Sequence, residues 1–460
     1  MAPLLSFAPP PDWAGLGRTL KGTLVRPGDR AYDGARRLFN PAFDSVRPGG
    51  VAYCAGASDV SACLAFARKN QLAVHPRSGG HSYAGWSTGP GLVVDVSRMN
   101  GVTYRDGRAT VGAGAKLVDV YGKLARHGVS IPAGTCPTVG VSGLTLGGGI
   151  GVVARKYGLT CDALESVQIV TADGRLLTCD AQHHAELFWA CRGGGGGNVG
   201  VAVSFTFLAH QTAQVTAFFL HWPWKKAAQA VRAWQSWAPA APDALWANLH
   251  LSRDTGGLDV QIGGLFLGTQ AGLAPLLKPL TDRLGAPSSR LVRQTTHHDA
   301  MMIMAGCSGL SVSQCHLPGQ TRDGRLSREA FTAKSHFAYR RIPAAGVDAL
   351  VAWVARKGRH TVLLDAMGGA VARVPEGATA FPHRQALFSV QYYAPGRDRS
   401  WVRGVHGALS PHLGDHAYVN YIDPDLASWR TAYYGRNAAR LAQVKAAYDP
   451  DRLFRLPQGF

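Results

Sequence analysis

The chain has 460 residues, of which 46% are hydrophobic and 17% are charged. This length and composition suit two or three domains, or one split domain with an insertion, and exclude a disordered chain. The net charge of +19 comes mainly from scattered arginines, without a dense basic block or a nucleic-acid-binding motif. We therefore expect attraction for anionic cofactors and substrates, and no nucleic-acid partner.

The eight cysteines include no CxxC pair, so we expect no metal site. Cys307 and Cys315 are close enough in sequence to form a disulfide, but the sequence leaves this open. No apolar run reaches the length of about eighteen residues that a membrane span needs. The N-terminal stretch is not typical of a signal peptide. The compartment is undetermined: cytoplasmic, or secreted after removal of a leader.

The first part of the chain predicts alternating strands and helices. A strand at 51–54 precedes a helix that Ser58 can cap, with an apolar stripe at helical spacing formed by Val60, Cys63, Leu64 and Ala67. The remaining elements expected here are strands at 72–75 and 92–96, a hairpin turn at 106–107, a helix at 117–124 ending by Gly128, strands at 167–170 and 176–179 around the turn at 173–174, and a strand at 201–207.

The pattern changes between residues 209 and 414. Strands are expected at 215–220, 245–251 and 258–266, and helices at 225–237 and 270–284. This alternation suits an antiparallel sheet covered by helices. In the last segment, Asp423 and Pro424 are typical of a helix start. One face of this helix would carry Trp429, Tyr433, Asn437, Leu441, Val444 and Tyr448, and we expect it to dock on the N-terminal region.

Two glycine-rich segments carry the chemistry. Residues 77–83, with the sequence RSGGHSY, follow a strand and leave several backbone N–H groups free to cradle a pyrophosphate. His81 would then lie near the ligand, although a surface loop with an ordinary histidine has the same pattern. Residues 134–151 hold Cys136, which could also be a simple buried apolar residue. The dinucleotide-like spacing at 149–154 lacks the strand and acidic residue of a Rossmann motif, so we reject that interpretation.

Together these segments resemble the vanillyl-alcohol-oxidase-type FAD-linked oxidases, and more narrowly the berberine-bridge-enzyme-like branch. The resemblance covers nearly the whole chain, through the segments 77–82, 134–151, 193–200, 418–423, 433–437, 448–450 and 454–458. It implies an α+β fold: a PCMH-type FAD-binding domain with an inserted substrate domain built on an antiparallel sheet covered by helices. We expect the FAD-binding domain at 1–208, the substrate domain at 209–414, and a C-terminal return to the FAD-binding domain at 415–460.

The resemblance also implies how FAD is held. In members with two covalent bonds, a histidine binds the flavin 8α-methyl group and a cysteine binds C6; His81 and Cys136 match them. Double attachment would leave the pocket open to bulky substrates. Other residues expected around the cofactor are Arg77, Ser78, Gly79, Gly80, Ser82, Gly140, Gly143, Gly147, Gly148, Gly149, Gly200, Val201 and Asn420.

Oxidation of an alcohol by a flavin requires loss of the hydroxyl proton and transfer of a hydride to N5. Tyr421 matches the family's tyrosine base, and we expect a nearby cation or partner to lower its pKa from about 10. Asp365 resembles the carboxylate that assists this tyrosine in sugar-oxidising members; capping of the Gly-Gly turn at 368–369 is the alternative. Tyr83, Gln391 and Tyr392 resemble residues that line the pocket, although buried tyrosines also serve plain packing.

Val139 matches the family's oxygen gate, where a small side chain leaves room for O2. We therefore expect an oxidase that releases hydrogen peroxide and acts on a hydroxyl-bearing carbon of a sugar, glycoside or secondary metabolite. The alternative is an oxidative cyclase or dehydrogenase acting on an alkaloid or polyketide-like compound. No match to the glutamate base of cyclising members is found, which favours the first. The expected partners are a small-molecule substrate and O2, and the oligomeric state, monomer or homodimer, is open.

Overall fold

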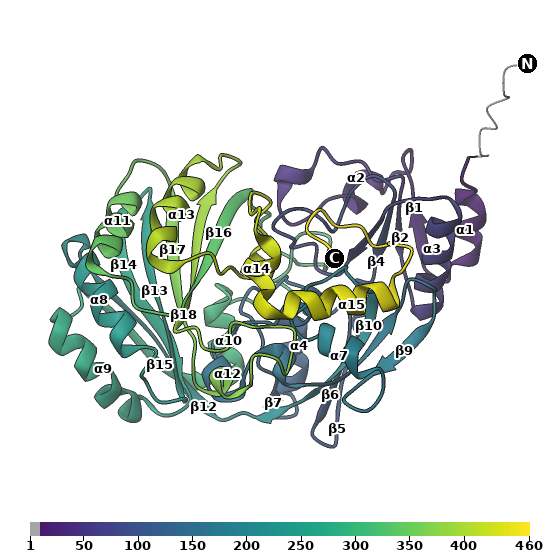
Figure 1. The fold of residues 1–460 in the computed structure, drawn as a ribbon. Coiled ribbons are helices and arrows are strands. Elements are labelled where there is room, and N and C mark those ends of the chain that lie inside the picture. The colour runs from purple at the N-terminus through teal and green to yellow at the C-terminus, as the bar shows by residue number, and fades with distance from the viewer. Residues whose placement is uncertain (1–9) are drawn as a thin grey trace, which may run out of the picture.

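The computed structural model describes residues 10–460 and holds two halves side by side, each built from sheets and helices (Figure 1). The first sheet has four strands in the order β1-β2-β4-β3. Its inner strand β4 is fully buried and pairs in parallel with β2 and β3. These strands run the same way because α3 (Ala57–Lys69) carries the chain from β2 to β3 and the loop 78–91 carries it from β3 to β4. The strand bounds are β1 Thr23–Val25, β2 Gly50–Tyr53, β3 Val74–Arg77 and β4 Leu92–Asp95.

The second sheet is antiparallel, with the order β5-β6-β10-β8-β9. The expected hairpin joins β5 to β6 at Asp106 and Gly107, whose φ angles of 49° and 80° suit the tight turn of an Asp-Gly pair. Its strands are β5 Val102–Arg105, β6 Arg108–Gly112, β8 Leu164–Val170, β9 Leu176–Cys179 and β10 Val201–Leu208.

The third sheet is antiparallel, with seven strands in the order β15-β12-β14-β13-β17-β18-β16. Its strands are β12 Gln214–Trp222, β13 Leu245–Asp254, β14 Gly257–Phe266, β15 Ser289–Thr296, β16 Phe331–Ala338, β17 His360–Ala366 and β18 Phe388–Pro395. One face packs under α8 (Ala227–Trp237), α9 (Gln270–Leu284), α11 (Ala344–Val354) and α13 (Ser400–Leu413), and together they bury a separate apolar core. The expected antiparallel sheet covered by helices is confirmed.

The remaining elements join these sheets. A two-stranded ladder pairs β7 (Val129–Ser130) with β11 (His210–Gln211). The helices are α1 Trp13–Thr19, α2 Tyr32–Ala35, α4 Leu117–Ala125, α5 Val141–Leu146, α6 Ala154–Tyr157, α7 Ala185–Ala190, α10 His297–Met304 and α12 Ala370–Arg373, with 3-10 turns at Pro41–Phe43, Thr160–Asp162 and Trp224–Lys226. A disulfide joins Cys307 to Cys315, the pairing that the sequence left open. None of the described helices is long and apolar enough to cross a membrane.

Two expected helix starts are wrong. Helix α3 begins at Ala57 with Gly56 as its N-cap, so Ser58 lies inside its first turn and does not cap it. The C-terminal helix does not begin at Asp423, whose carboxylate is held in an ion network. It forms instead as α14 (Trp429–Tyr434) and α15 (Ala438–Tyr448), separated by a 3-10 turn at Gly435–Asn437. Gly435 has a φ of 50°, which breaks the helix and redirects the chain.

The C-terminal segment packs back on the first half of the molecule. In Figure 1 the yellow helix α15 runs beside α7, which it contacts. The buried Lys445 ammonium donates hydrogen bonds to the carbonyls of Asn198, at 2.6 Å, and Phe454, at 2.7 Å. The apolar core of the first half therefore draws residues from both ends of the chain, including Tyr434, Leu441 and Phe460.

Candidate active site

A cavity of about 540 Å³ lies between the two halves of the molecule. Its walls come from four places: the loop after β3, the glycine-rich segment before and within α5, the loop before β10, and the inner face of the seven-stranded sheet. The segment 418–422 and Gln458 complete it from the C-terminal end. Such a volume is typical of a small-molecule or cofactor site.

The loop after β3 is held by a buried ion pair. Arg77, at the end of β3, pairs with Asp95 of the adjacent β4, and its Nη2 donates to the carbonyl of Ala35 at 2.7 Å. Gly79 and Gly140 bring this loop against the second glycine-rich segment, because a Cβ on either residue would clash with the backbone of the other. The two predicted ligand-binding segments therefore meet backbone to backbone, as only glycine permits.

His81 faces the cavity in a fixed orientation. Its ring stacks on Phe39, with centroids 4.1 Å apart and planes 19° from parallel. Its Nε2 hydrogen-bonds the Thr138 hydroxyl at 2.8 Å. Burial, with a smaller contribution from the Lys116 ammonium, lowers the pKa of the imidazole to about 3. His81 is therefore neutral near pH 7, and it retains a nitrogen lone pair.

Cys136 and Val139 lie on the wall beside it. Cys136 is the one free cysteine among the described residues that is exposed, and the cavity lining includes it. The surrounding protein, followed by the Asp365 carboxylate, raises the pKa of its thiol. Val139 lines the same wall. The structure thus places His81 and Cys136 in one cavity.

The inner face of the seven-stranded sheet forms the opposite wall. Asp365 of β17 stands between Asn248 of β13 and Ser389 of β18. Burial raises the pKa of the Asp365 carboxyl to about 7, against an opposing effect of the Ser389 hydroxyl. Gln391 lies two residues beyond Ser389 on the same face, and its Nε2 donates to the Tyr83 hydroxyl at 2.8 Å.

The expected position of Tyr392 is wrong. It was expected in the pocket, but side chains alternate along a strand, so Gln391 faces the cavity and Tyr392 faces the helices. Tyr392 is fully buried in the core beneath α13, and its hydroxyl hydrogen-bonds Nδ1 of His336 at 2.9 Å. It does not line the cavity.

Tyr421 projects into the cavity from the C-terminal segment. Its ring stacks on Tyr83, with centroids 5.2 Å apart and planes 18° from parallel. The expectation that a cation lowers its pKa is wrong for this structure: burial, with Tyr83 and Asp365 nearby, raises the pKa of the Tyr421 phenol well above its usual value. The phenol is therefore protonated and can donate a hydrogen bond.

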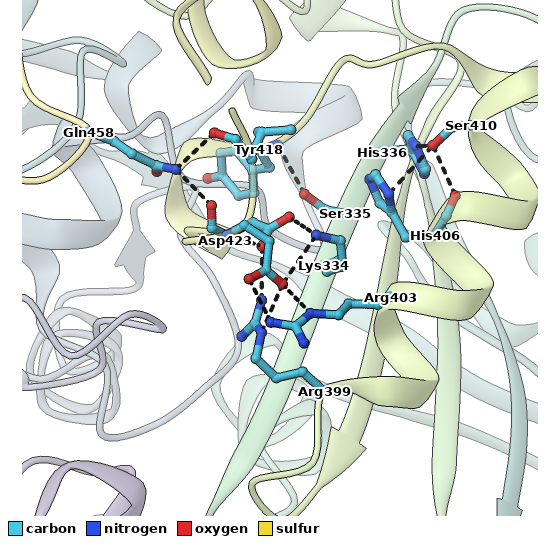
Figure 2. A network of polar contacts seen from close by, with 12 residues as sticks. Lys334, Ser335, His336, Arg399, Arg403, His406, Ser410, Tyr418, Asp423 and Gln458 are labelled. Carbon is cyan, nitrogen blue, oxygen red and sulfur yellow. Dashed lines mark hydrogen bonds and ion pairs between the residues drawn. The ribbon is translucent and has the colours of Figure 1, made fainter. Parts of the chain in front are cut away.

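A buried ion network holds the backbone next to Tyr421 (Figure 2). Asp423 pairs with the Lys334 ammonium of β16 and with Arg399, whose Nη2 lies 2.9 Å from it. Gln458 donates to the Asp423 carbonyl at 2.7 Å. The Tyr418 amide donates to the Ser335 hydroxyl at 3.1 Å. The segment 418–423 is thus tied to the sheet and to the C-terminal tail at once.

Asn420 lies at the cavity surface, whereas the three glycines at 147–149 do not. Asn420 lines the cavity, and its Nδ2 donates to the Leu144 carbonyl at 3.0 Å. Gly147, Gly148 and Gly149 do not line it, which corrects their expected position. They lie behind the wall, where a Cβ would clash with Asn420, Phe381 and Thr160 respectively. The remaining expected cofactor residues line the cavity: Arg77, Ser78, Gly79, Gly80, His81, Ser82, Cys136, Gly140, Gly143, Gly200 and Val201.

Sequence reasoning missed several cavity residues. Trp246, Asn248 and His250 alternate along β13 and point into the cavity. The Asn248 side-chain amide and the Nε2 of His250 are 2.9 Å apart, and burial lowers the pKa of His250 to about 4. The strand alternation was visible in the sequence, but nothing in it showed which face would meet a ligand.

The lining fits a flavin dinucleotide. Four polar atoms of lining residues are buried without a hydrogen-bond partner among residues 10–460: Nη1 of Arg77, Oδ1 of Asn198, Nε1 of Trp246 and Oε1 of Gln458. Unpaired buried polar atoms are costly unless a ligand satisfies them. A guanidinium and glycine amides suit phosphates, and amide groups suit the edge of a ring.

Comparison with known proteins also supports an FAD-binding site. Residues 48–180 match the FAD binding domain family, and residues 417–460 match the berberine and berberine-like family. An uncharacterised FAD-linked oxidoreductase of Bacillus subtilis is 34% identical over 95% of this chain and 96% of its own. A chitooligosaccharide oxidase of Gibberella zeae is 30% identical over 89% of this chain and 87% of its own. This chain belongs to the berberine-bridge-enzyme-like family of FAD-linked oxidases.

The structure of the berberine-bridge-enzyme-like protein 1 of Physcomitrella patens matches with a TM-score of 0.90 at 28% identity, and covers 97% of this chain and 98% of that one. The agreement extends over both halves of the molecule and the C-terminal return. As a berberine-bridge-enzyme-like protein, this chain is an FAD-dependent oxidoreductase.

Proposed function

We propose that the protein oxidises a hydroxyl-bearing carbon of a sugar, glycoside or secondary metabolite. FAD accepts the hydride, and O2 then reoxidises the flavin and is reduced to hydrogen peroxide. The observation that carries this proposal is one cavity in which His81 and Cys136 face a wall holding Asp365, Tyr421 and Gln391. A chitooligosaccharide oxidase among the relatives supports a carbohydrate substrate.

We infer that FAD is bound covalently through His81 and Cys136. The two residues come from separate loops, which Gly79 and Gly140 hold in contact. His81 is neutral, so its imidazole is a competent nucleophile. The Arg77 guanidinium and the glycine amides would hold the pyrophosphate, and Asn420 and Gln458 would face the ring system.

The cofactor supplies a two-electron acceptor for the hydride. The protein must supply a proton acceptor and hold the hydroxyl in place. With its pKa raised to about 7, the Asp365 carboxylate accepts the hydroxyl proton near neutrality. The Tyr421 phenol stays protonated and orients the substrate oxygen by a hydrogen bond. Gln391 fixes the Tyr83 hydroxyl and so the ring on which Tyr421 stacks.

Val139 is proposed as the oxygen gate. It lies on the cavity wall three residues after Cys136, and a side chain as small as valine would leave space for O2 beside a bound ring. We further propose that residues 1–208 and 415–460 bind FAD and that residues 209–414 bind the substrate. The apolar core beneath the seven-stranded sheet lies wholly within 209–414, which supports a separate unit there.

A substrate panel tests the proposal. Purified protein is mixed without oxygen with neutral mono- and oligosaccharides, glycosides, aromatic alcohols and alkaloids, and flavin absorbance is followed; oxygen is then admitted and peroxide is measured. We expect hydroxylated compounds to bleach the flavin and one peroxide to form per turnover. Bleaching without peroxide would identify a dehydrogenase, and a product with a new carbon–carbon bond would identify a cyclase. Absence of bleaching by every class would refute the function.

A further inference from the structure

Thr138 is buried, lies two residues after Cys136 in sequence and contacts His81, and the proposed reaction gives it no role. It is 2% exposed and does not line the cavity, yet its hydroxyl lies 2.8 Å from Nε2 of His81. The two residues are 57 positions apart in sequence, so the tertiary fold alone creates this contact.

The backbone on both sides of Thr138 is held by hydrogen bonds. The Pro137 carbonyl accepts a hydrogen bond from the Val118 amide at 3.1 Å, and the Val139 carbonyl accepts one from the Leu117 amide at 3.0 Å. Thr138 is thus fixed on both sides to the first turn of α4. A hydroxyl held in this way can set the orientation of a histidine ring.

The other side of the His81 ring is fixed as well. Phe39 stacks on it, and the Phe39 amide donates to the Gly80 carbonyl at 3.0 Å, which ties Phe39 to the loop. Within residues 10–460, Nδ1 of His81 has no hydrogen-bond partner in the protein, whereas Nε2 has Thr138. The imidazole therefore has one nitrogen, Nε2, paired with Thr138, and one nitrogen, Nδ1, without a partner among the described residues.

We propose that Thr138 is a positioning residue for attachment of FAD: its oxygen accepts a hydrogen bond from Nε2–H of His81, which selects the tautomer whose Nδ1 lone pair attacks the flavin 8α-carbon. The inference rests on the proposed attachment of FAD at His81. It names the attacking atom and the group that prepares it.

The step balances as follows. The Nδ1–C8α bond forms while one C8α–H bond breaks and its proton leaves; the electron pair reduces the ring by two electrons. The Nε2–H proton is lost once Nδ1 is alkylated, and Thr138 is its first hydrogen-bond partner. O2, the acceptor of the proposed reaction, then takes the two electrons and two protons as hydrogen peroxide, which restores the oxidised ring.

The test follows attachment itself and not turnover. Full-length protein with Cys136→Ala, which leaves only the His81 bond, is produced under riboflavin limitation and given saturating FAD in air. Samples are precipitated with acid over time, and covalent flavin is read as fluorescence of the protein band. Flavin retained without acid is measured in parallel, so that weakened binding is separated from slowed bond formation. Thr138→Val, Thr138→Ala and Thr138→Ser are compared in this background.

Thr145→Val is the matched control. Thr145 lies in the same glycine-rich segment and is fully buried, but its hydroxyl has no hydrogen-bond partner among the described residues. We expect Thr138→Val and Thr138→Ala to slow attachment about fivefold to tenfold, the effect of losing one hydrogen bond, whereas Thr138→Ser and Thr145→Val stay within about twofold. Thr138→Ala carries the test if the valine variant does not fold.

Three other outcomes would each contradict one part of the proposal. If Thr138→Ala attaches FAD as fast as the parent, Thr138 does not select the tautomer. If Thr145→Val slows attachment equally, the effect comes from packing and the inference is wrong. If the Cys136→Ala parent itself forms no covalent flavin, the attachment of FAD at His81 is wrong, and the inference fails with it.

Discussion

Replacing Asp365 with Asn removes a titrating group from the cavity while keeping its size. In the folded protein burial raises the pKa of Asp365 from 3.8 to about 7. An amide cannot ionise, so the variant loses every pH effect that this carboxyl causes. Two quantities should change together: the pH dependence of flavin reduction and the pH dependence of stability.

The magnitude follows from the shift of about three pKa units, at about 1.36 kcal/mol per unit. Below pH 3.8 the carboxyl is protonated in both states and contributes nothing. As the pH rises toward about 7, the unfolded chain ionises while the folded protein does not, so wild type loses stability. Above that pH the loss is complete and amounts to at most about 4 kcal/mol. Asp365→Asn should therefore be more stable than wild type at pH 8 and nearly equal to it at pH 4.

Two assays check this. Thermal melting of both proteins at a series of pH values should show a difference in Tm that grows with pH. Anaerobic stopped-flow with the best substrate should show that flavin reduction by wild type rises with an inflection near pH 7, because the ionised carboxyl is the proton acceptor. The variant should be slower, by about a hundredfold or more, and flat.

Asp254→Asn is the control, since Asp254 is exposed at the end of β13 and accepts a hydrogen bond from the Gly256 amide. It should match wild type in both assays. An inflection near pH 7 that survives in Asp365→Asn, or a Tm difference that does not vary with pH, would refute the assignment of the proton acceptor.

Three further predictions concern the cofactor, oxygen and the ion network. His81→Ala and Cys136→Ala should each keep flavin in the acid precipitate, whereas the double variant should release all of it; retained flavin in the double variant would contradict the attachment. Val139→Leu should slow reoxidation by O2 about tenfold or more and spare reduction by substrate, as measured by stopped-flow; unchanged reoxidation would end the gate assignment. Lys334→Met removes one of the two cations that pair with the buried Asp423 and leaves Arg399, so it should cost about 1.5 to 3 kcal/mol of stability in urea titration. An unchanged unfolding midpoint would show that the pair does not stabilise the fold.

Local patterns in the sequence predicted many of the longer strands and helices up to residue 284, but not the strands and helices between 289 and 413. The helix at 270–284 and the strand at 176–179 have the expected bounds, and the Asp106–Gly107 turn adopts the positive φ angles that this pair favours. Apolar periodicity and turn residues act over a few positions, so they can be interpreted without knowing the fold. The glycine-rich segments likewise predicted the FAD-binding family.

What lies beyond those patterns depends on contacts between distant residues. The sequence analysis placed both Gln391 and Tyr392 in the pocket, without a strand at this position. In the structure they are neighbours on β18 and face opposite ways, and the packing of α13 decides that Gln391 meets the cavity. The helix expected from Asp423 begins instead at Trp429, and the Asp423 carboxylate pairs with Lys334, far away in sequence.

The hydrogen bond between His81 and Thr138 is a further case, since neither loop alone predicts it. A single sequence determines which side chains share a face of a strand or helix, because that follows from backbone geometry. It does not determine what covers the face, because burial and ion pairing depend on the whole chain.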